Sequence, residues 1–331
     1  MKINSAVIGS GIGQKHIEAI DNYKNFYVST ILEKNKLKIK KLKKKYKNKK
    51  ITSNENEVFM DKSVKLVSIA SFDKDHFNQI MKCISNKKNF IVEKPICSTP
   101  SQLKKIGNII KKKNINLFSN LVLRVNSIFN NIKNIVDNKK VFYIEADYIW
   151  GRKNKLFGWR SKDKNYSLTL GGAIHVIDLI MWILNSRPVS VYTVGNNKVT
   201  KNTKFKKDNF IIYIFEFPKN VLVKITVNSA GIHEHFHKLI IYEQNKTIDH
   251  SINGSFLYKN YKDGKLKKTK IKGFYPDKKN RKKLIRNYLD HLINNKNKLI
   301  LKNKEQIDLM KVCFFADKSL KEKKKIKINY T

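Results

Sequence analysis

The sequence predicts an α/β protein of two domains: a doubly wound parallel sheet, followed by a second α/β domain with a largely antiparallel sheet. Through residues 1–122, short apolar segments alternate with helical patterns. Alternation of this kind implies right-handed crossovers and a parallel sheet. A glycine-rich turn separates the first apolar segment from the first helical pattern. Beyond residue 141, apolar segments follow one another without helices between them, which indicates antiparallel pairing.

The first domain shows the sequence patterns of both buried strands and amphipathic helices. Val64–Ala70 is apolar on both faces, as a buried parallel strand is. Leu37–Tyr46 is lysine-rich but carries apolar residues at helical spacing. We expect strands at Ile3–Ile8, Phe26–Leu32, Val64–Ala70, Phe90–Val92 and Ile115–Ser119, and helices at Gly13–Ile20, Leu37–Tyr46, His76–Asn86 and Ser101–Lys113.

The second domain is predicted from alternating segments with turn signals between them. Pro218-Lys219-Asn220 joins two of these segments and indicates a hairpin. We expect strands at Val141–Ile149, Val189–Val194, Phe210–Phe217, Val221–Asn228 and His235–Tyr242, and helices at His175–Leu184, Arg281–Asn294 and Glu305–Lys318. The composition changes near residues 121–126, so we place the domains at residues 1–122 and 123–331.

The net charge of +44 is extreme, yet its distribution argues against a specific nucleic-acid partner. Lysine occurs in nearly every polar segment and arginine is scarce, which indicates a chain-wide bias at solvated positions. The alternative, a polyanion partner, rests on net charge alone. The three cysteines fit neither a disulfide framework nor a zinc site, so a reducing cytoplasm is expected. No apolar run reaches membrane-spanning length, so no membrane association is expected.

The first glycine-rich turn has the chemistry of a dinucleotide site. Gly9, Gly11 and Gly13 let the backbone approach a pyrophosphate, and the dipole of the following helix favours negative charge. Glu33 ends the second strand, where a carboxylate accepts hydrogen bonds from ribose hydroxyls and repels a 2′-phosphate. This favours NAD over NADP, although Lys34 or Lys36 nearby offers a cation for that phosphate.

Two basic residues are candidates for proton transfer. Lys94 stands between an apolar strand and a proline, where a partly desolvated amine loses some preference for its charged form. His175 opens an apolar helix, with Asp178 one turn on to orient it; the imidazole either removes an alcohol proton or caps the helix.

Two further groups of residues are candidates for binding. His233, His235 and His237 alternate, so in a strand they share one face. Such a face could bind a metal, but three histidines on it are more often ordinary surface residues of a sheet, and we predict no metal. Trp159 and Arg160 suit a sugar or sugar phosphate, or serve in packing.

These motifs resemble the Gfo/Idh/MocA oxidoreductases, which include glucose–fructose oxidoreductase and inositol dehydrogenase. The resemblance runs almost end to end. It rests on the following residues: the glycine turn ending in His16, Ser71 to His76, Glu93-Lys94-Pro95, Arg124, Trp159-Arg160, Gly171 to Asp178, His235-Phe236-His237 and the closing helices.

The resemblance implies an N-terminal Rossmann domain and a C-terminal domain with an open antiparallel sheet. It implies catalysis by Lys94 and His175. The cofactor NAD or NADP would be bound by Gly9, Gly11, Ile12, Gly13, Glu33, Ser71, His76, Glu93 and Lys94. Substrate would be bound by Arg124, Trp159, Arg160, Asp178 and His235. Assembly as a homodimer or homotetramer is also implied.

One departure from the family concerns position 171. Many members carry an aspartate four residues before the histidine, where this chain has Gly171. The leading hypothesis is an NAD(P)-dependent oxidoreductase acting on a sugar or nucleotide sugar, in the style of surface-polysaccharide enzymes. The alternatives are an inositol (cyclitol) dehydrogenase and a dinucleotide-binding sensor without catalysis, and Gly171 keeps the sensor hypothesis open.

Overall fold

The computed structural model describes residues 2–260, 264–277, 279–294 and 298–331, and the chain forms two compact units. Unit 1 comprises residues 1–122 and 278–307, and unit 2 comprises residues 123–277 and 308–331. The division after Val122 falls at the domain boundary expected from the sequence. Residues 278–307, expected in the second domain, lie in unit 1, so the chain returns to its N-terminal unit before it ends in unit 2.

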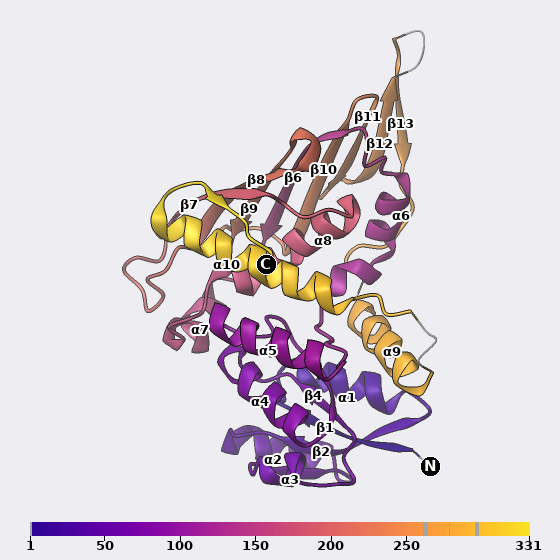
Figure 1. The fold of residues 1–331 in the computed structure, drawn as a ribbon, viewed down its shortest axis with the longest axis vertical. Helices are drawn as coiled ribbons and strands as arrows, with labels where there is room; N and C mark the ends of the chain where they lie inside the picture. The colour runs from indigo at the N-terminus through magenta and orange to yellow at the C-terminus, as the bar shows by residue number, and fades with distance from the viewer. Residues whose placement is uncertain (1, 261–263, 278, 295–297) are drawn as a thin grey trace. The chain divides into compact units, whose positions relative to one another are not determined.

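Unit 1 is built on a five-stranded parallel sheet with the strand order β3-β2-β1-β4-β5 (Figure 1). Its strands are β1 (Ile3–Ile8), β2 (Phe26–Leu32), β3 (Lys50–Thr52), β4 (Leu66–Ile69) and β5 (Asn89–Val92). β4 is buried along its whole length, as its continuous apolar sequence requires. The predicted parallel sheet is therefore confirmed.

The segment Ile115–Ser119 is not the predicted fifth strand. Only Ser119 pairs with the sheet, in a single bridge to Val92. The side chains of Asn303 and Gln306 form hydrogen bonds with backbone N–H and C=O groups of this segment. In a sheet, a neighbouring strand would form these hydrogen bonds instead. The fifth strand is β3 instead, and its three residues are too few for a periodic pattern.

Two helices of unit 1 begin at side-chain caps. The Asn35 side chain accepts a hydrogen bond from a backbone N–H of α2, and the Thr99 side chain does the same for α5, which has a proline in its first turn. The helices are α1 (Gly13–Asp21), α2 (Lys36–Lys45), α3 (Asn56–Phe59), α4 (Asp73–Ser85), α5 (Pro100–Lys112) and α9 (Asn280–Ile293). α9 is fixed to the unit by Tyr288, whose ring stacks on Phe118 at 4.5 Å.

Unit 2 contains a nine-stranded sheet with the order β13-β12-β11-β10-β6-β9-β8-β7-β14 (Figure 1). Only β6 and β9 run parallel; the other neighbours are antiparallel. The strands are β6 (Val141–Ile149), β7 (Ser190–Asn196), β8 (Phe210–Phe217), β9 (Val221–Asn228), β10 (Phe236–Glu243), β11 (Lys246–Ser251), β12 (Gly254–Asn260), β13 (Leu266–Lys270) and β14 (Ile326–Lys327). The predicted hairpin at Pro218–Asn220 joins β8 to β9.

Helices α6 (Ser127–Ile135), α7 (Trp159–Lys162) and α8 (Ile174–Leu184) belong to unit 2, and α10 (Asn303–Glu322) runs from unit 1 into it. A π-helical turn, Thr169–Ala173, leads into α8, and 3-10 turns occupy Val122–Val125 and Lys153–Phe157. α8 is apolar nearly all round and is buried, as such a helix must be. Among the described residues, no helix is both long and apolar enough to cross a membrane.

Candidate active site

The glycine turn of unit 1 fits a dinucleotide. Gly9 has a φ of +85°, and a Cβ there would lie 2.5 Å from the Ala70 carbonyl oxygen, so only glycine is tolerated. At Gly13 a Cβ would come within 3.1 Å of Val7, which lets α1 pack closely on β1. Nothing lies within 4 Å of a Cβ built on Gly11. The backbone at Gly11 is therefore open to a pyrophosphate at the start of α1.

Glu33 stands beside this turn as a fixed charge. Its carboxylate accepts hydrogen bonds from the Ser10 N–H (3.1 Å), the Ser10 hydroxyl and the Asn35 N–H (3.0 Å). Burial alone would raise the pKa of Glu33, but these hydrogen bonds outweigh burial and lower it. Lys34, an alternative partner for a 2′-phosphate, is engaged by Glu55 at 2.9 Å. An ionised carboxylate at the end of β2 suits ribose hydroxyls.

Glu93, at the end of β5, is the centre of a buried polar network. Its Oε1 accepts hydrogen bonds from His16 Nε2 (2.9 Å), Asn120 Nδ2 (2.7 Å) and Arg281 Nε (3.0 Å). His16 Nδ1 lies 2.6 Å from the hydroxyl of Ser68 on β4. Burial would raise the pKa of Glu93, but Arg281, His16 and Asn120 together lower it. The Glu93 network therefore joins α1, β4, β5 and α9 through one charged group.

Lys94 follows Glu93 directly and is half-buried. The chain beyond it is tied down by His76, whose Nδ1 donates to the Pro95 carbonyl at 2.6 Å. His76 is fully buried, and the hydroxyl of Ser71 donates to Gln79 at 2.6 Å. The sequence predicts Ser71, His76 and Glu93 to bind the cofactor. In the structure, Glu93 and the Pro95 carbonyl held by His76 flank Lys94 in the chain, and Ser71 bonds Gln79 on α4.

In unit 2, His175 lies on the first turn of α8, three residues after Gly172, and two tyrosine rings pack against Gly171 and Gly172. A Cβ on Gly172 would come within 2.8 Å of the Tyr148 ring, and one on Gly171 would overlap the Tyr166 hydroxyl. The ring of His175 lies parallel to that of Tyr148, with centroids 6.3 Å apart. The space where many family members carry an aspartate side chain is thus filled by Tyr166.

Arg124 and Asp178 are brought together by the fold. Nε of Arg124 lies 3.0 and 3.1 Å from the two carboxylate oxygens of Asp178, and Nη2 lies 2.6 Å from one of them. Both side chains are buried, at 3% and 1% exposure. The sequence suggested Asp178 as a partner that orients His175. The observed contact instead ties α8 to the start of unit 2 through an ion pair.

The alternating histidines do not all share a face, because β10 begins only at Phe236. His233 is exposed, and its ring contacts the Glu234 carbonyl. His235 and His237 do meet, with ring centroids 4.9 Å apart, and Nδ1 of His237 lies 2.5 Å from the Tyr275 hydroxyl. Burial lowers the pKa of both rings. The described residues contain no group of three or more candidate metal ligands.

Trp159 and Arg160 form part of an aromatic cluster. The Arg160 guanidinium carbon lies 4.5 Å from the ring centroid of Trp159, 5.1 Å from that of Trp150 and 5.7 Å from that of Tyr166. Trp150 follows β6 two residues after Tyr148. The sequence identified Trp159 and Arg160 but missed Tyr148 and Tyr166. The signal available was the Gly171-Gly172 pair, since adjacent glycines before a helix admit close packing of large rings.

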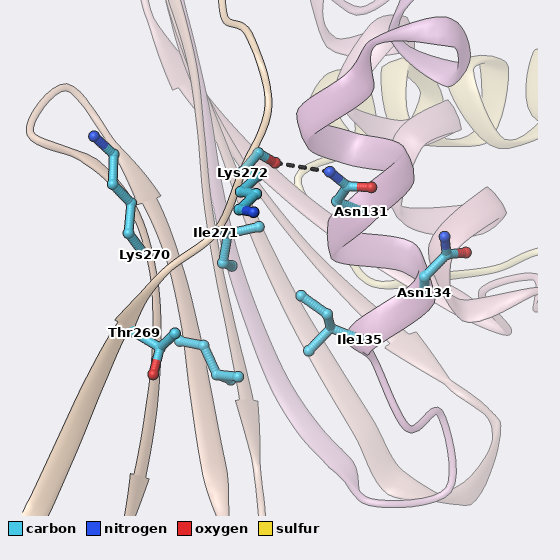
Figure 2. A pocket seen from close by; sticks show the side chains of 8 residues that line it. Asn131, Asn134, Ile135, Thr269, Lys270, Ile271 and Lys272 are labelled. Carbon is cyan, nitrogen blue, oxygen red and sulfur yellow. Dashed lines mark hydrogen bonds between the residues drawn. The ribbon is translucent and has the colours of Figure 1, made fainter.

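A hollow of about 300 Å³ lies elsewhere in unit 2, between α6 and strands β12 and β13. Figure 2 shows Asn131 reaching from α6 to the Lys272 carbonyl, a hydrogen bond of 2.8 Å, while Lys270 points away from the helix. Ile135 and Ile271 contribute apolar walls. None of the site residues predicted from the sequence lines this hollow.

Comparison with known proteins identifies both halves of the chain. Residues 3–121 match the oxidoreductase family with an NAD-binding Rossmann fold (GFO_IDH_MocA), and residues 129–249 match the GFO/IDH/MocA C-terminal domain. The uncharacterized oxidoreductase YrbE of Bacillus subtilis (strain 168) is 24% identical over 200 residues, covering 59% of this chain and 57% of that protein. The match thus spans little more than half the length of this curated relative.

Solved structures share the fold over nearly the whole chain. An NAD-binding protein from Listeria innocua is 17% identical with a TM-score of 0.83, covering 99% of this chain and 97% of its own. A scyllo-inositol dehydrogenase from Lactobacillus casei is 14% identical (TM-score 0.82; 99% of each chain). A UDP-N-acetylglucosamine 3-dehydrogenase from Acidithiobacillus ferrooxidans is 14% identical (TM-score 0.80; 98% and 99%). Identities at this level show a common fold.

Proposed function

Because the chain belongs to the GFO/IDH/MocA oxidoreductase family, we propose that it transfers a hydride between a nicotinamide dinucleotide and a carbinol or keto carbon of a sugar or nucleotide sugar. The observation that carries this proposal is the turn at Gly11, open to a phosphate and flanked by the ionised Glu33. Inositol dehydrogenases and a nucleotide-sugar dehydrogenase among the structural neighbours support the substrate class.

The residues divide the work between cofactor and substrate. The N–H groups near Gly11 and Gly13 hold the pyrophosphate, and Glu33 holds the adenosine ribose. When bound, the nicotinamide supplies the hydride acceptor or donor. Lys94 and His175 act on the substrate hydroxyl: one takes its proton as the carbon is oxidised, and the other donates a hydrogen bond that keeps the hydroxyl in place.

The test of this function separates binding from turnover. Purified protein is titrated with NADH and NADPH by fluorescence, and then assayed with a panel of keto-sugars, inositols and nucleotide sugars by following nicotinamide absorbance. We expect micromolar-range cofactor binding and turnover with at least one class of sugar. The absence of cofactor binding at any concentration tried would overturn the proposal.

One observation favours a second candidate, a dinucleotide-binding sensor without catalysis. Position 171 has no carboxylate, and the Tyr166 hydroxyl fills the space beside it. A chain that binds NADH but turns over no member of the panel would support the sensor.

Self-association is supported by the open face of the unit 2 sheet. Large apolar side chains there are exposed by 37–43%, namely Tyr192, Val194, Ile214 and Leu222. They alternate with buried residues along β7, β8 and β9, which are paired in register. A homodimer or homotetramer formed through this face is expected, and light scattering after gel filtration measures its mass.

A further inference from the structure

The loop after β6 in unit 2 carries five cations, of which Arg152, Lys155 and Arg160 lie close enough for their charges to act on one another. Arg152 and Lys155 are exposed, and Arg160 is half-buried. Lysine is the default cation of this chain, because only six of its 70 lysines and arginines are arginines. Arginine differs from lysine in presenting a planar fork of donors that matches a carboxylate or phosphate. In a chain that otherwise uses lysine, an arginine therefore indicates a position where its paired N–H donors bind an acceptor.

Three of the other arginines do use it on carboxylates. These pairs are Arg124 with Asp178, Arg187 with Asp308, and Arg281 with Glu93. Within the described part of the chain, neither Arg152 nor Arg160 forms an ion pair. The two arginines of the loop after β6 therefore offer donors that no described carboxylate of the protein takes.

Arg160 is held in a fixed position without being saturated. Its guanidinium lies against the rings of Trp150, Trp159 and Tyr166. It makes one hydrogen bond among the described residues, from Nη1 to the Lys155 carbonyl at 3.3 Å. Stacking on aromatic faces restrains an arginine at little cost to its donors. A cation that is already ordered loses less entropy when it binds an anion.

The one carboxylate close in sequence, Asp163, forms no ion pair with the three cations among the described residues. It is buried, its Oδ1 accepts a hydrogen bond from the Asn165 N–H at 2.9 Å, and its Oδ2 accepts none from a described residue. The ammonium of Lys207 donates to the carbonyls of Asp163, Lys164 and Tyr166 at 2.7–2.8 Å, which fixes the turn that carries Tyr166. Asp163 thus belongs to the support of the turn.

The three cations also act on one another and on the nearby histidine. Burial and the charges of Arg152 and Arg160 lower the pKa of Lys155. Burial and the charge of Arg152 lower the pKa of His235, with a smaller part from Lys155. Like charges that are gathered without a counter-charge repel each other, and a bound anion relieves that repulsion.

This cationic loop is connected to His175 within the same unit. Tyr166, under Arg160, packs on Gly171, which lies one turn before His175. Tyr148 lies parallel to the His175 ring, and its edge meets the ring of His235 at 5.4 Å. The loop and the imidazole are therefore connected within unit 2 through Tyr148 and Tyr166.

We propose that Arg152, Lys155 and Arg160 bind an oxyanion of the substrate, a phosphate or a carboxylate. The substrate class is then an anionic sugar, with its reacting carbon toward His175 and its charge on the loop. This inference rests on the function proposed above. The shared chemistry is an oxyanion that accepts two parallel N–H bonds from an arginine.

The first experiment measures binding without turnover. Glucose 1-phosphate, UDP-glucose, glucuronate, glucose and myo-inositol are titrated at about 0.15 M ionic strength, which screens the bulk positive field. Calorimetry and the fluorescence of Trp150 and Trp159 report binding. We expect the anionic probes to bind at least about tenfold tighter than the neutral sugars. Tighter binding of the phosphates assigns a phosphate, and tighter binding of glucuronate assigns a carboxylate. Equal affinity for glucose and all anions overturns the proposal.

The second experiment separates the arginine fork from its charge. Arg160→Lys and Arg152→Lys keep the net charge but lose the two-pronged donor. We expect each to weaken binding of the preferred anion about tenfold or more, and neutral sugars to be unaffected. Lys198→Gln, an exposed lysine of the same unit, removes a charge elsewhere and should change affinity less than twofold. Unchanged anion binding in both arginine variants overturns the proposal, and circular dichroism confirms their folding.

The two proposals fail separately. If the redox function is wrong, anion binding that depends on Arg160 still appears in the titrations, without turnover. If the oxyanion site is wrong, turnover appears with neutral sugars and is unaltered in Arg160→Lys.

Discussion

Each unit contains a buried polar cluster, and the two clusters differ in charge. In unit 1, the carboxylate of Glu93 is buried in its charged form and receives hydrogen bonds from His16, Asn120 and Arg281. In unit 2, the rings of His237 and His250 are buried among aromatic side chains, and burial lowers the pKa of both. The Glu93 network is therefore a charged centre, and the histidine cluster, which is distinct from the buried Arg124–Asp178 ion pair of unit 2, is a neutral one.

The two clusters also differ in how their hydrogen bonds can rearrange. A buried charge with three donors has one satisfied arrangement, which suits the strand end that presents Lys94. A neutral cluster of imidazole and phenol groups can exchange donor and acceptor roles by a change of tautomer, without gaining a charge. The Glu93 network is thus expected to set stability, while the histidine cluster responds to protons.

Removing the charge in unit 1 has the largest expected effect. Glu93→Gln leaves Arg281 and His16 without their anion, and we expect the free energy of unfolding to fall by about 3 kcal/mol. Urea denaturation measures it. Glu57→Gln, which breaks an exposed pair with Lys50 and alters a side-chain hydrogen bond with Thr52, is the matched control and should cost less than about 1 kcal/mol. Equal losses in the two variants would contradict a charged centre.

As pH falls, the stability contributed by neutral His250 should be lost before the stability contributed by ionised Glu93. Burial lowers the pKa of His250 to about 4, so the unfolded chain takes up the proton first as pH falls below about 6.5. The contribution of neutral His250 is complete above that pH and is lost as pH falls toward 4, by about 3 kcal/mol. Glu93, whose pKa is lowered, loses its contribution only below about 4.

The measurement for this prediction is urea denaturation across pH 4–7 in wild type and in His250→Gln. The variant should show a shallower slope of stability with pH between those limits, whatever its stability at pH 7. An identical slope in both proteins would mean that His250 is not held neutral.

A smaller effect is expected where Tyr166 replaces a side chain at position 171. Gly171→Ala puts a methyl group against the Tyr166 ring, and we expect a loss of about 2 kcal/mol in the free energy of unfolding. In a Tyr166→Ala background the same change should cost little. Gly158→Ala, where a Cβ meets nothing within 4 Å, is the control. Equal costs of Gly171→Ala in both backgrounds would show that the ring does not occupy this space.

The smallest expected effect concerns the other carboxylate of unit 1. We expect wild type to bind NADH more tightly than NADPH, and Glu33→Ser to narrow that ratio about tenfold by removing repulsion of the 2′-phosphate. Fluorescence titration of both cofactors gives the ratio, in which any shared structural damage cancels. A ratio unchanged by the substitution would remove Glu33 from cofactor choice.

Most of the fold could be predicted because its signals are local. β1, β2, β6, β8 and β9 have the predicted limits, since each is a run of apolar or alternating residues closed by turn signals. β11, β12 and β13 were missed because lysine and asparagine at their exposed positions hide the alternation. Helix α6 was missed although its apolar residues recur at helical spacing.

The sequence could predict only those parts of the candidate site whose residues lie close together in the chain. The glycine turn and Glu33 follow from strand–turn–helix order. Arg281 lies 188 residues from Glu93, and no pattern in either segment links them. His233 was assigned to the face of His235 because alternation alone does not show where a strand begins.

We propose that Lys94 acts on the substrate hydroxyl in an NAD-dependent oxidoreductase, either by taking its proton or by holding it in place. The most direct measurement is a comparison of kcat and of the Kd for NADH between wild type and Lys94→Ala, using the substrate found in the panel, with the exposed Lys104→Ala as control. We predict that kcat falls by about 10³-fold in Lys94→Ala while the Kd stays within about twofold. Full activity in Lys94→Ala would contradict the account.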